Sequence, residues 1–194
     1  NCMLNPKYPA AVVAGNVETS QHLVNALLSA LDVMSSSQGT MNNLTFGNKK
    51  YQYYETICSG SPAGPDFHGT NAIQVHMTNS RLTDPEILEL KFPVILKDFH
   101  IRRNSGGKGF CNGGDGTFRE ILFKEDMELA ILSSHRKIKP HGLKGGENGK
   151  LGKNYIIRKN KNKEILHGCD YRKVKKGDAI IIETPTPGGY GKRK

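Results

Sequence analysis

Residues 117–133 read TFREILFKEDMELAILS, and this stretch decides the fold class. Apolar residues alternate with polar ones in two short runs, 117–123 and 128–133, as in strands with one buried face. Similar runs occur at 51–58, 72–77, 94–102, 154–158 and 179–184. Sixteen of the 22 glycines follow residue 105, which predicts tight turns between strands. We therefore expect residues 93–194 to form a glycine-rich, predominantly antiparallel β unit.

The segment before this unit, residues 1–92, contains the clearest helical pattern. Between residues 17 and 34, valine, leucine and methionine recur at three- and four-residue steps, with Asn16 at the capping position and Glu18 in the first turn. A shorter helix is expected at 84–90, where Thr83 can cap and Pro85 suits the first turn. The predicted fold is α+β, with one long N-terminal helix packed on the β unit.

Charge is distributed unevenly along the chain. There are 28 Lys+Arg against 18 Asp+Glu, a net charge of +10; residues 1–90 carry −3 and residues 91–194 carry +13. Basic residues such as Lys97, Arg119, Lys124, Arg158 and Lys159 alternate with or flank apolar strand positions. Aromatic residues are not interleaved with them, as a base-stacking surface would require. The pattern favours a solvated sheet face over a nucleic-acid site and leaves a basic β module that binds an anionic partner as a remote alternative.

Several classes of protein are excluded or disfavoured. No apolar run approaches the roughly 18–20 residues of a membrane span, and no signal-peptide pattern opens the chain. Its four cysteines lie far apart, which predicts reduced thiols and a cytoplasmic location. The glycine-rich stretch 105–116 lacks the spacing of a phosphate loop and is expected to connect two strands. The histidines show no metal-binding spacing, so no metal site is predicted within this chain.

Two polar clusters are candidates for a pocket. One combines 16–21 with 37–43, at the two ends of the predicted helix, and the other is 76–81, at the end of a predicted strand. Uncharged amides offer a donor and an acceptor together, which suits recognition of a small polar ligand. The alternative, that these residues cap and turn the chain, stays open.

The same clusters resemble a known family. The matching segments keep their order along the chain: YPAAVVAGNVETSQ at 8–21, SQGTMNN at 37–43, YYET at 53–56, HMTN at 76–79, TDPE at 83–86, GGDG at 113–116 and GGYG at 188–191. Together they resemble the C-terminal part of the hydantoinase B/oxoprolinase family. One departure is Gln74, which stands where the family usually has a histidine.

The resemblance implies an enzyme that opens a cyclic amide, and it is closest to the branch that hydrolyses 5-oxo-L-proline to L-glutamate with ATP, magnesium and a monovalent cation. It implies that the chain is a piece of a longer, homo-oligomeric protein and is inactive alone. The ATP and metal sites would lie upstream, in hydantoinase A-type and B-type regions. An N-methylhydantoinase or hydantoinase B-type subunit is the alternative within the family.

The resemblance also suggests roles for individual residues in the pocket-forming segment 1–92. His76 and Glu55 are the predicted proton carriers, and Arg81 is the predicted partner of the substrate carboxylate. The remaining predicted substrate-binding residues are Asn16, Glu18, Ser20, Gln21, Gln38, Asn42, Asn43, Tyr54, Thr78 and Asn79.

Overall fold

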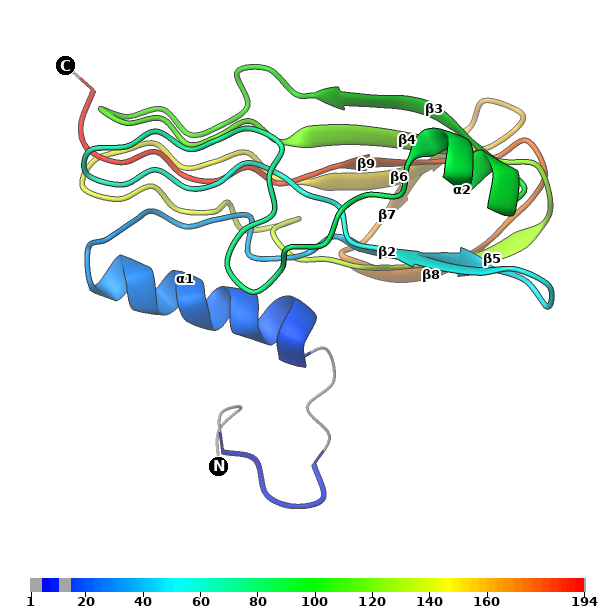
Figure 1. Ribbon diagram of the computed structural model, residues 1–194, viewed down its shortest axis with the longest axis horizontal. Coiled ribbons are helices and arrows are strands. Elements are labelled where there is room, and N and C mark those ends of the chain that lie inside the picture. The colour runs from blue at the N-terminus through cyan, green and yellow to red at the C-terminus, as the bar shows by residue number, and fades with distance from the viewer. Residues whose placement is uncertain (1–4, 11–14, 194) are drawn as a thin grey trace.

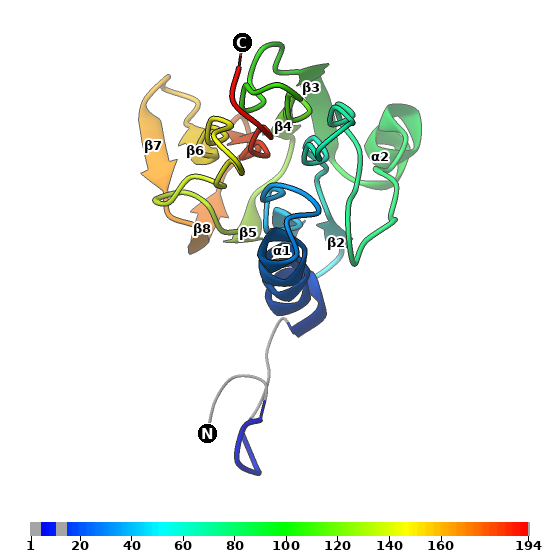
Figure 2. The same ribbon diagram turned by 90° about the vertical axis from the view of Figure 1, so that its left-hand side faces the viewer.

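Two antiparallel sheets stack face to face in the computed structural model, which describes residues 5–10 and 15–193 (Figures 1 and 2). One sheet has the order β2-β1-β5-β8, formed by Gln52–Glu55, Asn43–Gly47, Met127–Leu132 and Cys169–Val174. The other has the order β3-β4-β9-β6-β7, formed by Val94–Ile101, Thr117–Phe123, Ala179–Glu183, Lys153–Ile157 and Lys163–Leu166. Strands from both sides of residue 92 therefore share the first sheet.

The core lies between the two sheets. Buried residues alternate with less buried ones along β4, so one face of this strand points inward. Phe46 of β1 meets Phe123 of β4 edge to face, with ring centroids 5.4 Å apart. Every strand contributes at least one buried apolar residue to the cluster around them. Helix α2 (Pro85–Lys91) contributes one as well. This apolar layer confirms the predicted antiparallel β unit and fixes both sheets in position.

The N-terminal helix differs from the prediction. A π-helical turn, η1 (Gly15–Thr19), leads into α1 (Ser20–Ala30), which has 11 residues, so the helix is shorter than the predicted 17–34. Thr19 occupies its N-cap position in place of Asn16. Leu27 and Leu31, predicted to pack on the sheet, are 60% and 63% exposed, while Gln21 and Asn25 are buried. The helix therefore contacts the rest of the chain through its polar face.

Helix α2 begins one residue later than predicted. Asp84, and not Thr83, is its N-cap residue, because the Asp84 carboxylate accepts hydrogen bonds from the backbone N–H groups of Glu86 and Ile87. Pro85 occupies the first turn as expected. Leu88 points into the core and anchors the helix beside β3 and β4 (Figure 1).

The glycine-rich stretches do not form the predicted succession of tight turns. Extended segments at 58–70, 105–116, 139–152 and 184–191 run alongside one another and exchange backbone hydrogen bonds, and Figure 1 shows them at the end of the molecule away from α2. A Cβ atom on Gly114 would lie 2.1 Å from the Thr70 carbonyl oxygen, and one on Gly149 would lie 1.8 Å from that of Thr186. Glycine is needed here because the backbones approach so closely.

Three strands were missed and one prediction was wrong. Strands β1, β7 and β8 carry too few apolar residues for a strand pattern. The predicted strand 72–77 is absent, because Ala72 and His76 adopt positive φ angles of 50° and 56°, which a strand does not accommodate. Within the described ranges, no helix is long and apolar enough to cross a membrane.

Candidate functional site

Asn43, at the start of β1, connects the two segments of the first predicted cluster to each other and to β2. Its amide nitrogen donates to Glu18 Oε1 at 3.0 Å and to the Leu132 carbonyl at 2.9 Å. Its amide oxygen accepts a hydrogen bond of 2.7 Å from the Tyr54 hydroxyl. A small hollow of about 170 Å³ opens beside Asn43 and Tyr54. The structure thus brings together Glu18, Asn43 and Tyr54, three of the predicted substrate-binding residues.

Glu18 is the acid of this cluster. Thr40 donates to Glu18 Oε1 at 2.5 Å, and the nearby buried Arg136 attracts the carboxylate. Burial raises the pKa of Glu18, although the hydrogen bond from Thr40 and the charge of Arg136 oppose the rise. Burial also lowers the pKa of Arg136 to about 9. Because the effect of burial exceeds these opposing contacts, Glu18 takes up a proton more readily than an ordinary glutamate.

Four buried side-chain amides, on α1 and on the segment after it, have a hydrogen-bond partner for one of their two polar atoms and none among the described residues for the other. Gln21 donates to the Val75 carbonyl at 3.2 Å, and Asn42 donates to Gln38 Oε1 at 2.7 Å and to the Ile57 carbonyl at 3.0 Å. Asn25 Oδ1 accepts the backbone N–H of Ser37 at 2.9 Å. These partners fix the amide orientations and leave four polar atoms unpaired: Gln21 Oε1, Asn25 Nδ2, Gln38 Nε2 and Asn42 Oδ1.

His76 links the second predicted cluster to helix α1. Its Nε2 lies 2.9 Å from Asn25 Oδ1, and because an amide oxygen only accepts, Nε2 carries the proton in this contact. The other ring nitrogen, Nδ1, then holds a lone pair when the ring is neutral. Burial lowers the pKa of His76, which favours the neutral ring near pH 7. Asn25 therefore sets the tautomer of a histidine suited to accept a proton.

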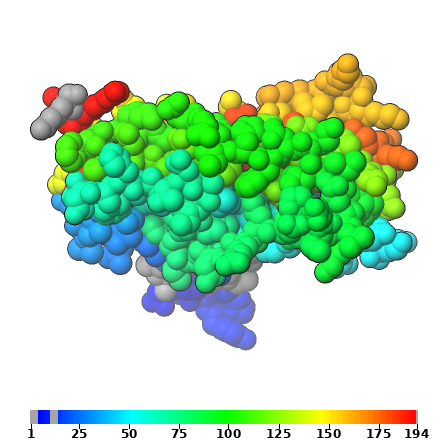
Figure 3. Space-filling view, turned by 45° about the horizontal axis from the view of Figure 1, so that its top comes forward, coloured from blue at the N-terminus to red at the C-terminus, as the bar shows by residue number. Residues whose placement is uncertain are grey.

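A groove of about 490 Å³ is lined by Thr78, Asn79 and Arg81, which follow His76 in the sequence. Cys58 and Phe99 contribute to its walls. Cys58 is a buried free cysteine. Figure 3 shows the surrounding face, where the segment after β2, in teal, lies beside the green residues of α2 and β3. An exposed guanidinium beside hydroxyl and amide groups suits a small ligand with a carboxylate.

Glu55 lies apart from these groups. Its carboxylate is 5% exposed and forms two hydrogen bonds with Arg119, at 2.7 and 2.9 Å, between the sheets. It also accepts a hydrogen bond from the Tyr53 hydroxyl at 2.9 Å. Arg119 itself is 2% exposed, so the expectation that it belongs to a solvated sheet face was wrong. This geometry favours a structural ion pair that joins the two sheets.

Two histidines that the sequence analysis did not single out lie beside Gly39. Ser134 donates to the Gly39 carbonyl, so its oxygen accepts from His22 Nε2 at 3.0 Å. His135 donates from Nδ1 to the Ile138 carbonyl at 2.7 Å, and its buried Nε2 has no hydrogen-bond partner in the described part of the chain. Burial is the main reason that the pKa of His135 falls to about 4.

The sequence carried a usable signal for only one of the missed residues. Asn25 lies four positions after Gln21, so both belong to one face of the helix, opposite the exposed Leu23 and Leu27. His22, Ser134 and Arg136 reach the cluster through the fold, and no local pattern marks them. Asn16 and Ser20 are placed in and next to the π-helical turn, where the Ser20 hydroxyl bonds to the Asn16 carbonyl. No group of three or more His, Cys, Asp or Glu that could hold a metal ion occurs among the described residues.

Comparison with known proteins gives a consistent result. A sequence model of the hydantoinase B/oxoprolinase family matches residues 1–193. The chain is 49% identical to 5-oxoprolinase 1 of Arabidopsis thaliana over 97% of its length and 47% identical to the 5-oxoprolinase of Dictyostelium discoideum over 98%. It spans 15% of the length of each of these two relatives.

A solved structure has the same fold. The crystal structure of an ATP-dependent caprolactamase from Pseudomonas jessenii superposes with a TM-score of 0.80 at 22% sequence identity. The match covers 97% of this chain and 36% of the caprolactamase chain. The overall fold of this chain is thus found in an experimental structure.

Proposed function

Because the chain belongs to the hydantoinase B/oxoprolinase family, we propose that it forms part of an ATP-dependent enzyme that hydrolyses 5-oxo-L-proline to L-glutamate. The observation that carries this proposal is the 47–49% identity to two proteins named 5-oxoprolinase, which extends over nearly the whole chain. The rest of the enzyme, with hydantoinase A-type and further B-type regions, lies outside these residues in the proposal. Homo-oligomeric assembly and a cytoplasmic location belong to the same proposal.

The chemistry explains why ATP is needed. A planar, unstrained lactam is a poor electrophile, and phosphorylation of its carbonyl oxygen makes the carbonyl carbon open to attack by water. The glycine-rich stretch is not suited to hold the nucleotide, because its amides bond to neighbouring chain segments, as Gly107 N–H does to Pro187 and Gly114 N–H does to Ser61. In the proposal, ATP, magnesium and the monovalent cation bind to regions of the enzyme outside this chain.

The groove supplies a place for the substrate. In the proposal, Arg81 pairs with the carboxylate of 5-oxo-L-proline, and Thr78 and Asn79 bond to its polar edge. The groove volume of about 490 Å³ falls in the range of small-molecule sites and exceeds the needs of a five-membered ring. The guanidinium of Arg81 is exposed at the groove and therefore accessible to a ligand.

His76 acts as the proton carrier in this scheme. Asn25 holds the Nε2–H, so Nδ1 accepts a proton from the water that adds to the carbonyl carbon. The carbon–nitrogen bond of the ring then breaks, and the nitrogen takes up a proton to become the amine. Hydrolysis of the resulting acyl phosphate by a second water releases inorganic phosphate and gives glutamate. Asn25 is a positioning residue here, since it acts through the imidazole.

In the proposal, the amide cluster adds further polar contacts to the substrate. A lactam presents one N–H donor and one C=O acceptor, and the buried amides retain unpaired atoms of both kinds. We propose that the cluster supports substrate recognition through its predicted members: Asn16, Glu18, Ser20, Gln21, Gln38, Asn42, Asn43 and Tyr54. Glu55 stays a prediction as a second proton carrier, and its pairing with Arg119 supports a structural role instead.

A hydantoinase B-type activity is the alternative, since the family name covers both. The deciding experiment uses the longer protein that contains this chain, incubated with ATP, magnesium and potassium. We expect glutamate to form from 5-oxo-L-proline and N-methylhydantoin to compete weakly. Hydrolysis of hydantoins alone, with no glutamate formed, would reject the 5-oxoprolinase proposal and leave the alternative.

A further inference from the structure

The turns β6–β7 and β8–β9 enclose a groove of about 920 Å³ at the end of the sandwich away from the glycine-rich segments. Four exposed lysines line it: Lys159, Lys173, Lys175 and Lys176. None of their ammonium groups has an ion-pair partner within the described part of the chain. We call this feature the lysine groove. It is separate from the candidate site, which lies around α1 and the segment 72–82.

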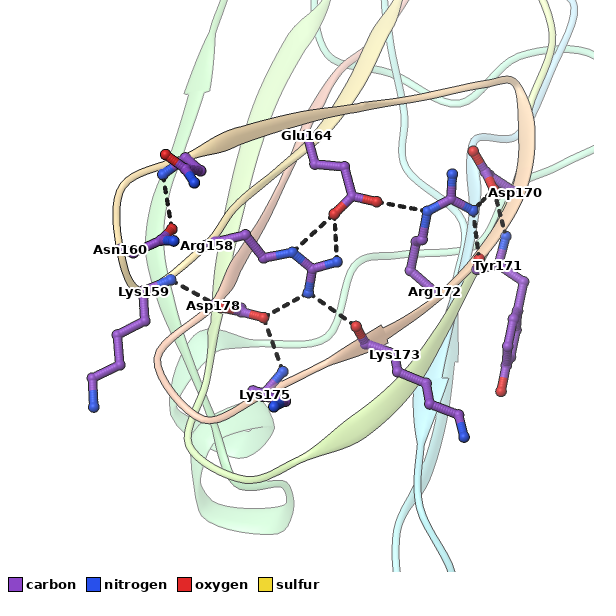
Figure 4. Close-up of polar contacts among 11 residues, drawn as sticks. Arg158, Lys159, Asn160, Glu164, Asp170, Tyr171, Arg172, Lys173, Lys175 and Asp178 are labelled. Atoms are coloured by element: carbon purple, nitrogen blue, oxygen red, sulfur yellow. Dashed lines mark hydrogen bonds and ion pairs between the residues drawn. The ribbon is translucent and has the colours of Figure 1, made fainter.

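A buried carboxylate fixes the floor of the lysine groove. Asp178 accepts hydrogen bonds from the backbone N–H groups of Lys159 and Lys175, both at 2.9 Å, and from Arg158 Nη1 at 2.7 Å (Figure 4). Burial alone would raise the pKa of Asp178, but these donors outweigh burial and lower it. Because one carboxylate binds both turns, the lysine side chains project from a backbone that is held in place.

The arginines beside the lysine groove are already occupied. Arg158 also donates to Glu164 and to the Lys173 carbonyl, and Arg172 donates to Glu164 and Asp170 (Figure 4). Two arginines thus face three carboxylates, counting Asp178, so this network has a net charge of −1. Asp126, which accepts the backbone N–H of Lys176, also lines the groove, so the four lysines leave a net charge of +2 that is available to a partner.

We propose that the lysine groove binds an acidic polypeptide segment that carries several carboxylates. Charge complementarity determines the class of partner, since four ammonium groups on flexible stems can each pair with a carboxylate along an extended chain. Exposed apolar side chains on the neighbouring edge strands, Ile165 of β7 and Tyr171 of β8, offer contacts for such a segment.

The geometry disfavours phosphate and nucleic acid as the occupant. Phosphate recognition commonly uses a free guanidinium fork or free backbone amides, and here the arginines and the N–H groups of Lys159, Lys175 and Lys176 are all engaged. No aromatic residue lines the lysine groove, so bases would find no stacking platform. This inference does not depend on the proposed enzymatic activity.

The test measures binding of a fluorescein-labelled octamer of glutamate to the 194-residue chain by anisotropy, at low and moderate salt. The groove variant replaces the four lysines by glutamine: Lys159, Lys173, Lys175 and Lys176. A control variant with the same change in net charge replaces four exposed lysines elsewhere: Lys91, Lys97, Lys137 and Lys139. A glutamine octamer and a thymidine octanucleotide complete the set of probes, and circular dichroism checks that both variants fold.

We expect the groove variant to bind the glutamate octamer at least about tenfold more weakly, the control variant to stay within about threefold, and binding to weaken as salt rises. Equal losses in the two variants would mean that only net charge matters and would overturn the proposal. Absence of binding to the glutamate octamer, or tighter binding of the oligonucleotide through the same lysines, would overturn it as well.

Discussion

The guanidinium of Arg119 on β4 and the carboxylate of Glu55 on β2 form a doubly hydrogen-bonded ion pair that crosses from one sheet to the other. Its two N–O distances are 2.7 and 2.9 Å, and the side chains are 1% and 3% exposed. A pair buried this well has lost its hydration and depends on its own geometry for compensation. Removing one partner would leave an uncompensated charge in the core.

Replacement of Glu55 by glutamine should therefore lower the free energy of unfolding by about 3 kcal/mol, the lower end of the range for a broken buried pair. Urea unfolding of the chain measures this change, with Glu128→Gln, an exposed residue of β5, as the matched control. We expect the control to change stability by less than about 0.5 kcal/mol. A loss below about 1 kcal/mol in Glu55→Gln would contradict a structural role for the pair.

This pair also shows what the sequence could and could not predict. The two-residue period of β4 placed Arg119 on the same face as Ile121 and Phe123, which are buried. The charge of Arg119 predicted that it would be exposed to solvent, because the neighbouring sequence does not reveal its partner, Glu55, which lies 64 residues away. The two-residue alternation of apolar side chains predicts where strands form. It does not predict whether a charged residue is buried, because burial depends on tertiary contacts.

Helix α1 also differs from the prediction, because it buries polar residues where apolar residues were expected. Leucines at helical spacing predicted a buried apolar face, yet α1 buries Gln21 and Asn25 against polar loops. The amide-rich segments were correctly grouped in sequence, because residues that flank a helix meet again when the chain turns back along it. The contributions of Ser134 and Arg136 come from beyond β5 and could not be predicted without the fold.

Glu18 should respond differently to two substitutions. Alanine leaves the Thr40 hydroxyl and the Asn43 amide without their acceptor and should cost about 1–3 kcal/mol. Glutamine keeps an acceptor oxygen and removes a buried charge. The raised pKa of Glu18 means that its contribution is present below pH 4.5 and is lost as pH rises through the folded value. Glu18→Gln should thus gain stability over wild type as the pH rises above 4.5 in urea titrations, and a constant difference would argue against the raised pKa.

His135 should make the chain sensitive to acid. Its pKa falls from an ordinary 6.5 to about 4, so the unfolded state binds the proton first, and stability is full above pH 6.5 and declines as pH falls towards 4. The difference corresponds to roughly 3 kcal/mol at most. His135→Asn, which tolerates the positive φ of 53°, should flatten the pH profile of unfolding, whereas His167→Asn at an exposed position should leave it as in wild type. Parallel profiles for all three proteins would refute this role.

Gly114 tests the close packing of the extended segments. A Cβ atom there would lie 2.1 Å from the Thr70 carbonyl oxygen and 2.6 Å from its carbon, so the backbones must separate. We expect Gly114→Ala to cost more than about 2 kcal/mol. Gly145→Ala is the comparison, since its nearest neighbour would be 3.3 Å away and the cost comes mainly from its φ of 88°. Equal thermal shifts in the two variants would show that steric contact between backbones does not decide the need for glycine.

The proposed catalytic arrangement makes separable predictions for the longer enzyme that contains this chain. Arg81→Ala should raise KM for 5-oxo-L-proline at least about tenfold and leave kcat less changed, because a charge-assisted hydrogen bond to the carboxylate is lost in both substrate and transition state. His76→Ala should lower kcat by about 10²-fold or more, the usual contribution of a general base.

Asn25→Ala should lower kcat less and shift the acidic limb of the pH–kcat profile, while Asn25→Asp, which keeps an acceptor for the His76 Nε2–H, should restore part of the rate. Unchanged kcat in His76→Ala would remove this histidine from the reaction, and an Asn25→Ala loss without any shift in the profile would reduce Asn25 to a structural residue.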